Sequence, residues 1–300
     1  MALTVEGQPA LTRTVAAPGK MPTARIYEDV RAELLSAPGA GQKRAPLVTI
    51  IPSKGRPESV ARTVRAWVET GAFTVGAIRW ALNASDPRVD EYLDAIGAIG
   101  GTPGALTAVV YPNVRMVPRL NQACLDLLDD DQAGRIRAIG FQGDDHVPAS
   151  EDWARRYLAV LDGMTRTHGA GMVHGDDGLR GAKLASEWCV SRSWVQTLGR
   201  MVPALVQHLY CDDAVQDLAK AAGIYRYLGD GDGAVRITHV HPLAEGTSAV
   251  LDETYRSGGL NSSLKASDHQ AYLKWSMRPE QIDKTGLARQ AGMLRALKPE

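Results

Sequence analysis

Two adjacent carboxylates and an imidazole, Asp144, Asp145 and His146, follow an apolar run that ends at Phe141. Such a cluster after a buried strand is costly unless a cation neutralises it. Mg²⁺ and Mn²⁺ bind through one or two carboxylates together with substrate phosphates. The loop therefore indicates a divalent metal site, and the alternative is a solvated acidic turn that caps the next helix.

A second group that could bind a metal is His239-Val240-His241. Residues two apart on a strand point to the same side. One imidazole could therefore reach a metal ion while the other orients it. The alternative is a pair of structural histidines.

Acidic residues also begin a predicted helix at Cys211-Asp212-Asp213. A carboxylate in this place could act as a general base toward an acceptor hydroxyl. Helix capping and the helix dipole favour acidic residues at the same positions without any catalytic role.

Four cations lie in or beside two further loops that follow predicted strands, and Asn83 and Asp86 lie in a third. The cations could stabilise a diphosphate, or they could be ordinary surface charges. Asn83 and Asp86 could hydrogen-bond a base or a ribose, or form a simple turn. The four cations are Lys54, Arg56, Arg115 and Arg119.

Four cycles of strand and helix position these loops. Short apolar and β-branched runs alternate with amphipathic segments, which predicts an α/β domain with a doubly wound, mostly parallel sheet and helices on both faces. Ligands bind such sheets beyond the carboxyl ends of the strands. The predicted strands are 47–51, 77–82, 106–110 and 135–141, and the helices between them are 58–69, 90–99 and 119–128.

The rest of the chain is less regular. We expect an N-terminal arm (1–45) with a helix at 26–35, a catalytic domain (46–245) and a C-terminal extension (246–300) of loop and one or two helices. Within the domain the patterns predict a helix at 151–161 capped by Ser150, a Gly-rich stretch at 169–181, a helical region at 193–209, a helix at 212–222 and a strand at 235–240.

Composition limits the classes of function. The 34 basic and 34 acidic residues cancel, whereas a dedicated nucleic-acid-binding protein usually carries a basic excess. Three widely spaced cysteines predict buried thiols in a reducing cytoplasm rather than disulfides or a zinc site. We expect no signal peptide, and no stretch approaches the ~20 apolar residues of a membrane span.

Taken in order, these segments resemble the GT-A glycosyltransferases, in particular their large inverting family. VTIIPSKGRPESVARTV is similar to that family's first strand, nucleotide-binding turn and helix, and YPNVRMVPRLNQAC to its segment with an Arg before an Asn-led helix. IGFQGDDHVPASEDW resembles its DxD region, LYCDDAVQDLAKAAG its acidic catalytic helix start, and ITHVHP its late metal-binding histidine. HPLAEGTSAVLDETYR is similar to glycosyltransferase-like proteins of bacteriophages.

The resemblance implies transfer of a hexosyl or pentosyl group from a nucleotide-diphosphate sugar, a UDP-sugar above all, to a hydroxyl acceptor, with Mn²⁺ or Mg²⁺. It places the metal on Asp144, Asp145 and His241, and the catalytic base at Asp213 or Asp212. Gln142 replaces the first Asp of the DxD triplet, and Cys-Asp-Asp replaces Glu-Asp at the helix start. The residues implied in nucleotide-sugar binding are Pro52, Ser53, Lys54, Arg56, Asn83, Arg119, Gln142, Gly143 and Asp144.

Two other functions stay open at this point. A nucleotidyltransferase can use a similar sheet and metal, although the sequence lacks a Gly-rich P-loop for a triphosphate. A non-catalytic structural protein on a degenerate transferase fold is the other. If the protein comes from a bacteriophage, the acceptors to expect are hydroxylated bases of phage DNA and side chains of virion proteins, and the neutral charge disfavours duplex DNA.

Overall fold

The computed structural model describes residues 24–37, 45–100, 104–240, 262–277 and 287–297. Its centre is a seven-stranded sheet with the strand order β3-β2-β1-β4-β7-β6-β8, and β5 and β9 form a second, two-stranded sheet. The strands are β1 (Leu47–Ser53), β2 (Gly76–Asn83), β3 (Leu106–Tyr111), β4 (Ala138–Phe141), β5 (His146–Pro148), β6 (Met172–His174), β7 (Trp188–Ser191), β8 (Tyr225–Tyr227) and β9 (Ile237–His239).

The large sheet is mostly parallel, as the sequence predicts. β1 pairs in parallel with β2 and β4, and β2 with β3. Only β7 runs in the opposite direction, between β4 and β6. Every residue of β1 and β2 is buried, which explains why both strands are mostly apolar rather than alternating between apolar and polar residues.

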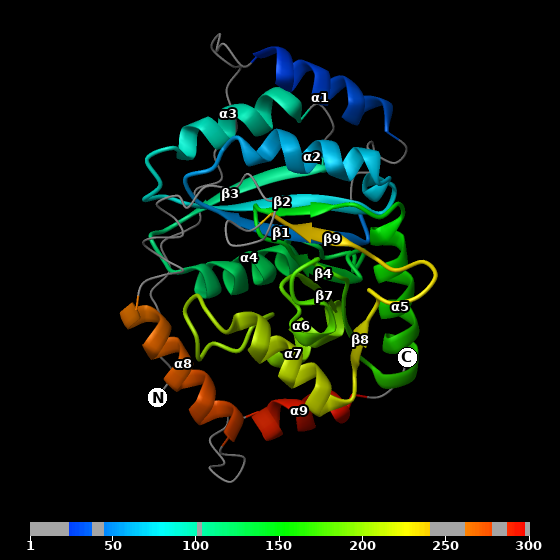
Figure 1. Cartoon of the computed structure of the whole chain (residues 1–300), viewed down its shortest axis with the longest axis vertical. Helices are drawn as coiled ribbons and strands as arrows, with labels where there is room; N and C mark the ends of the chain where they lie inside the picture. Colours follow the sequence, from blue (N-terminus) through cyan, green and yellow to red (C-terminus); the bar gives the residue numbers. More distant parts are fainter. Residues whose placement is uncertain (1–23, 38–44, 101–103, 241–261, 278–286, 298–300) are drawn as a thin grey trace.

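Helices cover both faces of this sheet (Figure 1). α2 and α3 lie on one face with α1 packed on top of them, and α4 lies against β1 and β2 on the other. α6 and α7 follow farther out, where α9 packs against both. The helices are α1 (Ala24–Ser36), α2 (Ser59–Glu69), α3 (Val89–Ile99), α4 (Met116–Asp130), α5 (Trp153–His168), α6 (Arg192–Leu198), α7 (Cys211–Ala222), α8 (Ser262–Met277) and α9 (Leu287–Arg295).

Tryptophans fill the core on both sides of the sheet. Trp67 of α2 and Trp153 of α5 meet edge to face with ring centroids 5.2 Å apart, and Phe141 stacks on Trp188 at 4.2 Å. All three cysteines are free and buried, as predicted. Within the described ranges, no helix is both long and apolar enough to span a membrane.

Two local predictions are wrong. Ser150 does not cap α5, because its hydroxyl donates to the carbonyl of Ala234 and accepts from the N–H of Arg236. The helical region expected at 193–209 ends at Leu198, where Gly199 takes a left-handed conformation with φ 66°. The segment 199–210 is irregular because side chains from α4 and α8 bind its backbone N–H groups.

Candidate metal and substrate site

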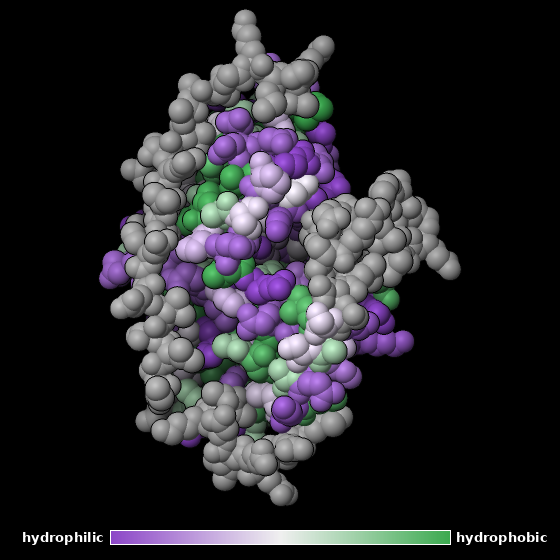
Figure 2. All heavy atoms as spheres, turned by 90° about the vertical axis from the view of Figure 1, so that its left-hand side faces the viewer, coloured by the Kyte–Doolittle hydropathy of each residue, from purple (hydrophilic) through white to green (hydrophobic). Residues whose placement is uncertain are grey.

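Four strands bring their polar ends to one edge of the sheet. β1 ends at Ser53, β2 at Asn83 and β4 at Phe141, all pointing the same way. β7 runs in reverse, and its first residue, Trp188, pairs with Phe141, so the residues before Trp188 arrive at the same edge. Figure 2 turns the left-hand side of Figure 1, where α2 and α4 begin, toward the viewer, and hydrophilic residues gather across the middle of this face.

Asp145, His146 and His239 form a group that could hold a metal ion, with one ligand atom of each within 4.8 Å of the others. The pairing of β5 with β9 places His146 opposite His239, and their rings stack at 4.2 Å. His146 Nδ1 lies 3.3 Å from Asp145 Oδ1, and His239 Nε2 lies 3.6 Å from Asp145 Oδ2. Both imidazoles therefore turn one nitrogen toward the same carboxylate.

The other nitrogen of His239 faces Asp177, and that of His146 reaches Asp177 through Ser186. His239 Nδ1 lies 4.0 Å from Asp177 Oδ2, and His146 Nε2 lies 3.4 Å from the hydroxyl of Ser186, which donates to Asp177 Oδ2 at 2.7 Å. Asp177 itself is buried and fixed by the backbone N–H groups of residues 179–181. A carboxylate behind the imidazoles is the arrangement that orients metal-binding histidines in proteins.

The protonation of this group suits a cation. Burial acts to raise the pKa of Asp145, but hydrogen bonds and charge from His146 and His239 outweigh it, and the pKa lies well below the usual value. Burial, together with the neighbouring His239, lowers the pKa of His146. At neutral pH the structure therefore offers an ionised carboxylate and a neutral imidazole, the forms that bind metals.

Gly143 is required for space in this loop. A Cβ at this position would lie 2.5 Å from Asp145 Oδ1 and 2.7 Å from His146 Nδ1. Its N–H donates to His146 Nδ1 at 3.0 Å. The glycine thus lets the backbone approach both candidate ligands closely.

Asp144 faces the end of β1 instead. Its carboxylate accepts hydrogen bonds from the hydroxyl of Ser53 and from Arg56 Nη1, the latter at 2.7 Å. Arg56 Nη1 is also 3.6 Å from Asp145 Oδ2, so one guanidinium borders both carboxylates. Burial raises the pKa of Asp144 to about 6, against the opposing effect of Arg56. Tyr92 completes the cluster through hydrogen bonds with Ser53 (2.6 Å) and the N–H of Arg56 (2.7 Å).

Arg119 is a buried cation with unused hydrogen-bond donors. The residue is 5% exposed, and its Nε and Nη1 have no hydrogen-bond partner among the described residues. Burial lowers its pKa to about 10, while the charges of Tyr92, Asp144 and Asp86 act in the opposite direction. A buried guanidinium without such partners is costly, and an anionic group of a ligand would satisfy it.

Asn83 and Asp86 form a turn, which is the simpler of the two alternatives that the sequence offers for them. The Asn83 amide binds the carbonyl of Val114 and accepts from the N–H of Ser85. Asp86 accepts from the N–H groups of Gly55 (2.6 Å) and Arg88 (2.9 Å), so it ties the loop after β2 to the loop after β1. These two residues therefore stabilise the loops that follow the strands at this edge of the sheet.

Three other predicted binding residues differ in their surroundings. Pro52 is buried within β1, whereas Lys54 is exposed at the start of the following turn. Gln142 is 1% exposed and its carbonyl accepts from the indole N–H of Trp67 at 3.3 Å. Gln142 thus contacts the core under α2.

Asp212 and Asp213 lie in the first turn of α7, as predicted; the helix begins at Cys211, directly after Tyr210 in a left-handed conformation with φ 60°. Burial, followed by the charge of Asp213, raises the pKa of Asp212 to about 6. One turn later, Gln216 binds the carbonyl of Lys183 and the N–H of Ala185, next to Ser186. α7 therefore contacts the segment that leads into Ser186 through Gln216. His241 lies outside the described residues.

The structure thus brings together Asp145 with His146 and His239, and Asp144 with Ser53 and Arg56. Sequence reasoning missed the supporting roles of Asp177 and Ser186. Both lie in irregular segments whose position depends on β6 and β7, and these short strands carry no periodic pattern of their own.

No protein-family model matches the chain, and no curated protein matches it. Among solved structures, it is similar to the mannosyltransferase PcManGT from Pyrobaculum calidifontis in complex with GDP-Man and Mn²⁺ (TM-score 0.47, 14% identity, 74% of this chain and 66% of that one). It is also similar to S. aureus TarS in complex with UDP (TM-score 0.45, 11% identity, 64% and 60%). A third is a putative glucose-1-phosphate thymidylyltransferase from Bacillus anthracis (TM-score 0.40, 11% identity, 62% and 87%).

The chain spans about two thirds or less of the lengths of the first two proteins.

Proposed function

We propose that this protein is a metal-dependent glycosyltransferase that moves a sugar from a nucleotide-diphosphate donor to a hydroxyl acceptor. The observation that carries the proposal is the group Asp145–His146–His239, backed by Asp177, at the strand edge where α/β sheets bind ligands. The unsatisfied guanidinium of Arg119 supports the presence of an anionic ligand.

The metal in this proposal is bound by Asp145, His146 and His239. Asp144 was the first ligand expected from sequence, but its oxygens are engaged by Ser53 and Arg56, so we assign it the role of holding Arg56 in place. Two imidazole nitrogens favour a first-row transition ion over Mg²⁺, which prefers oxygen ligands. Of the two ions that the sequence resemblance implies, the geometry therefore favours Mn²⁺. When bound, such an ion neutralises the diphosphate leaving group.

The chain's own cations complete the donor site. Arg119 supplies unused N–H donors from α4, and Arg56 lies against both carboxylates after β1. The turn from Pro52 to Arg56 provides the surface for the base of the nucleotide, which we take to be uridine. Because these groups are fixed by burial and by ion pairing, the donor would meet a site that needs little rearrangement.

Asp213 or Asp212 serves as the base that takes the proton of the acceptor hydroxyl. Both carboxylates lie in the first turn of α7. Burial raises the pKa of both groups, which strengthens them as bases near neutral pH. In this proposal the acceptor is a hydroxyl compound, such as a hydroxylated DNA base or a side chain of a virion protein. The reaction takes place in the cytoplasm.

The test is thermal melting of the purified protein with UDP-, GDP-, CDP- and dTDP-sugars, each with and without Mn²⁺. A ligand that binds only the folded state raises the melting temperature. We expect a rise with one donor, and only when Mn²⁺ is present. Asp145→Asn should remove the rise, whereas Asp129→Asn, at an exposed position far along α4, should keep it.

An absence of any rise would contradict the proposal. A rise with nucleoside triphosphates alone would instead identify a nucleotidyltransferase.

A further inference from the structure

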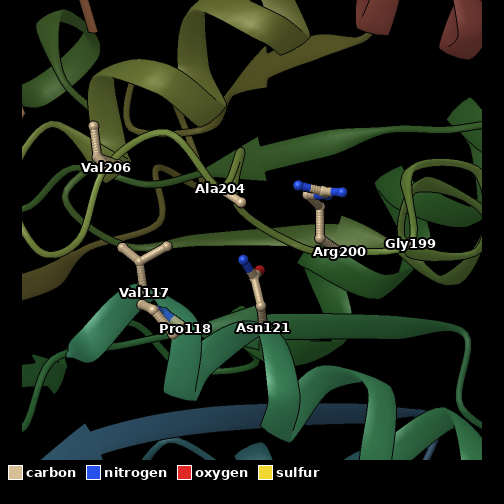
Figure 3. A pocket seen from close by; sticks show the side chains of 7 residues that line it. All are labelled: Val117, Pro118, Asn121, Gly199, Arg200, Ala204 and Val206. Carbon is tan, nitrogen blue, oxygen red and sulfur yellow. The ribbon is translucent and has the colours of Figure 1, made fainter. Parts of the chain in front are cut away.

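A pocket separate from the metal group opens between α4 and the irregular segment 199–206 (Figure 3). Its volume is about 220 Å³. In the view of Figure 3, one wall rises from α4 and the other comes from the segment after α6. The lining residues are Val117, Pro118, Asn121, Gly199, Arg200, Ala204 and Val206.

The irregular wall of this pocket is held in place by side chains from two helices. Asn121 of α4 accepts from the N–H groups of Met201 and Val202 and donates to the carbonyl of Val202 at 2.9 Å. Asp268 of α8, which is 1% exposed, accepts from the backbone N–H groups of residues 207, 208 and 209 at 3.0, 2.9 and 2.9 Å. Since an irregular wall pinned at both ends cannot readily collapse, the pocket is preformed.

The lining has the chemistry of a small ligand site. Valine, proline and alanine side chains make it mostly apolar, and the Asn121 amide is already used by the backbone. The one charged lining residue is Arg200, whose Nε donates to the carbonyl of Leu198 at 3.3 Å. Within the described ranges, no carboxylate forms an ion pair with Arg200. A cavity of about 150 Å³ is enough for a benzene ring.

Both walls are continuous in sequence with residues of the candidate site. Arg119, two residues after Val117, carries the unused donors. The segment that contributes Val206 continues to Cys211 and the acidic start of α7. The N–H of Val117 donates to the carbonyl of Gln207 at 3.0 Å and joins the walls at that end.

We propose that this pocket binds a ring-sized apolar group that carries a carboxylate, and that this group is part of the acceptor. The ring fills the apolar space, and the carboxylate pairs with Arg200. The assignment to the acceptor rests on the proposed function, whereas the binding of such a group does not.

Binding is measured by NMR of the full chain, titrated with phenylacetate in the absence of metal and nucleotide. A fragment of this size should bind with a Kd on the order of 1 mM. Acetate lacks the ring and benzyl alcohol lacks the charge, so both should bind at least ~10-fold more weakly.

Two variants locate the site. Ala204→Trp fills the pocket from an exposed position and should abolish binding. Arg200→Gln should weaken binding by about 10-fold. Arg166→Gln, an exposed arginine on α5, is the matched control and should leave binding unchanged. No saturable binding of phenylacetate, or equal binding to wild type and Ala204→Trp, would overturn the proposal.

A second measurement separates this proposal from the proposed function. In Ala204→Trp, the Mn²⁺-dependent rise in melting temperature with the donor should stay as in the wild type. If the wild type shows no donor effect but binds phenylacetate, the transferase proposal fails while the pocket stands. If Ala204→Trp transfers the sugar to a ring-bearing acceptor with the same KM for that acceptor as the wild type, the acceptor assignment fails.

Discussion

The raised pKa of the buried Glu187, next to the candidate site in sequence, predicts a measurable pH dependence of stability. The residue is 1% exposed and its carboxylate accepts hydrogen bonds from the hydroxyl of Tyr157 (2.6 Å) and the N–H of Gly175 (2.7 Å). Burial raises its pKa to about 7 from an ordinary value of 4.5, against the opposing effect of those hydrogen bonds. Glu187 directly follows Ser186, which contacts His146.

The sign of the effect follows from the raised pKa. Between about pH 4.5 and about pH 7 the folded protein keeps a proton on Glu187 that the unfolded chain releases. The free energy of unfolding therefore falls as the pH rises through this window. At about 1.4 kcal/mol for each pH unit, the loss contributed by Glu187 reaches about 3 kcal/mol by pH 8. Glu187→Gln has no proton to lose and should be free of this contribution.

The assay is urea unfolding of wild type and Glu187→Gln at a series of pH values. The variant's free energy of unfolding, relative to wild type, should increase by about 3 kcal/mol between about pH 4.5 and about pH 8. The difference removes the contributions of other titrating groups. Glu69→Gln, at an exposed position on α2, should run parallel to wild type. Parallel curves for Glu187→Gln as well would show that the pKa of Glu187 is not raised in the folded protein.

Three further changes test the site and its supports. Gly143→Ala forces a Cβ against Asp145 and His146 and should weaken Mn²⁺ binding at least ~10-fold by calorimetry; unchanged affinity would show that the loop relaxes. Ser186→Ala removes the hydroxyl that connects His146 to Asp177 and should lower the Mn²⁺ affinity about 10- to 100-fold. A loss below ~2-fold would show that Ser186 does not orient His146 for metal binding. Asp268→Ala removes the acceptor of three backbone hydrogen bonds and should lower the free energy of unfolding by about 3 kcal/mol in urea. An unaffected midpoint would show that these hydrogen bonds do not hold residues 207–209 in place.

The central part of the fold is predictable from sequence because β1 and β2 are long and buried. Their mostly apolar sequences, each followed by an amphipathic helix, indicate a parallel arrangement. The strands β6, β7 and β8 have three or four residues each and form only through their neighbours in the sheet. Such segments lack a local pattern, so tertiary pairing alone creates them.

The candidate site is predictable in its parts but not in its assembly. The acidic loop and the histidine pair stand out by residue type. That His146 faces His239 depends on the register of β5 with β9, which pairs residues about ninety positions apart. The choice between Asp144 and Asp145 depends on the direction of two adjacent side chains, and Asp144 turns to Ser53 and Arg56. No local feature distinguishes Arg119 from a surface arginine, because its burial results from packing across the sheet.

The most direct test of the proposed metal site is a Mn²⁺ titration of the wild type and of His239→Ala, monitored by electron paramagnetic resonance. The structure predicts one tight ion for each chain in the wild type, held by Asp145, His146 and His239, and loss of that ion in the variant. His168→Ala, an exposed histidine at the end of α5, should bind as the wild type does. Tight binding of Mn²⁺ that persists unchanged in His239→Ala, or no binding to the wild type, would contradict the proposed metal site.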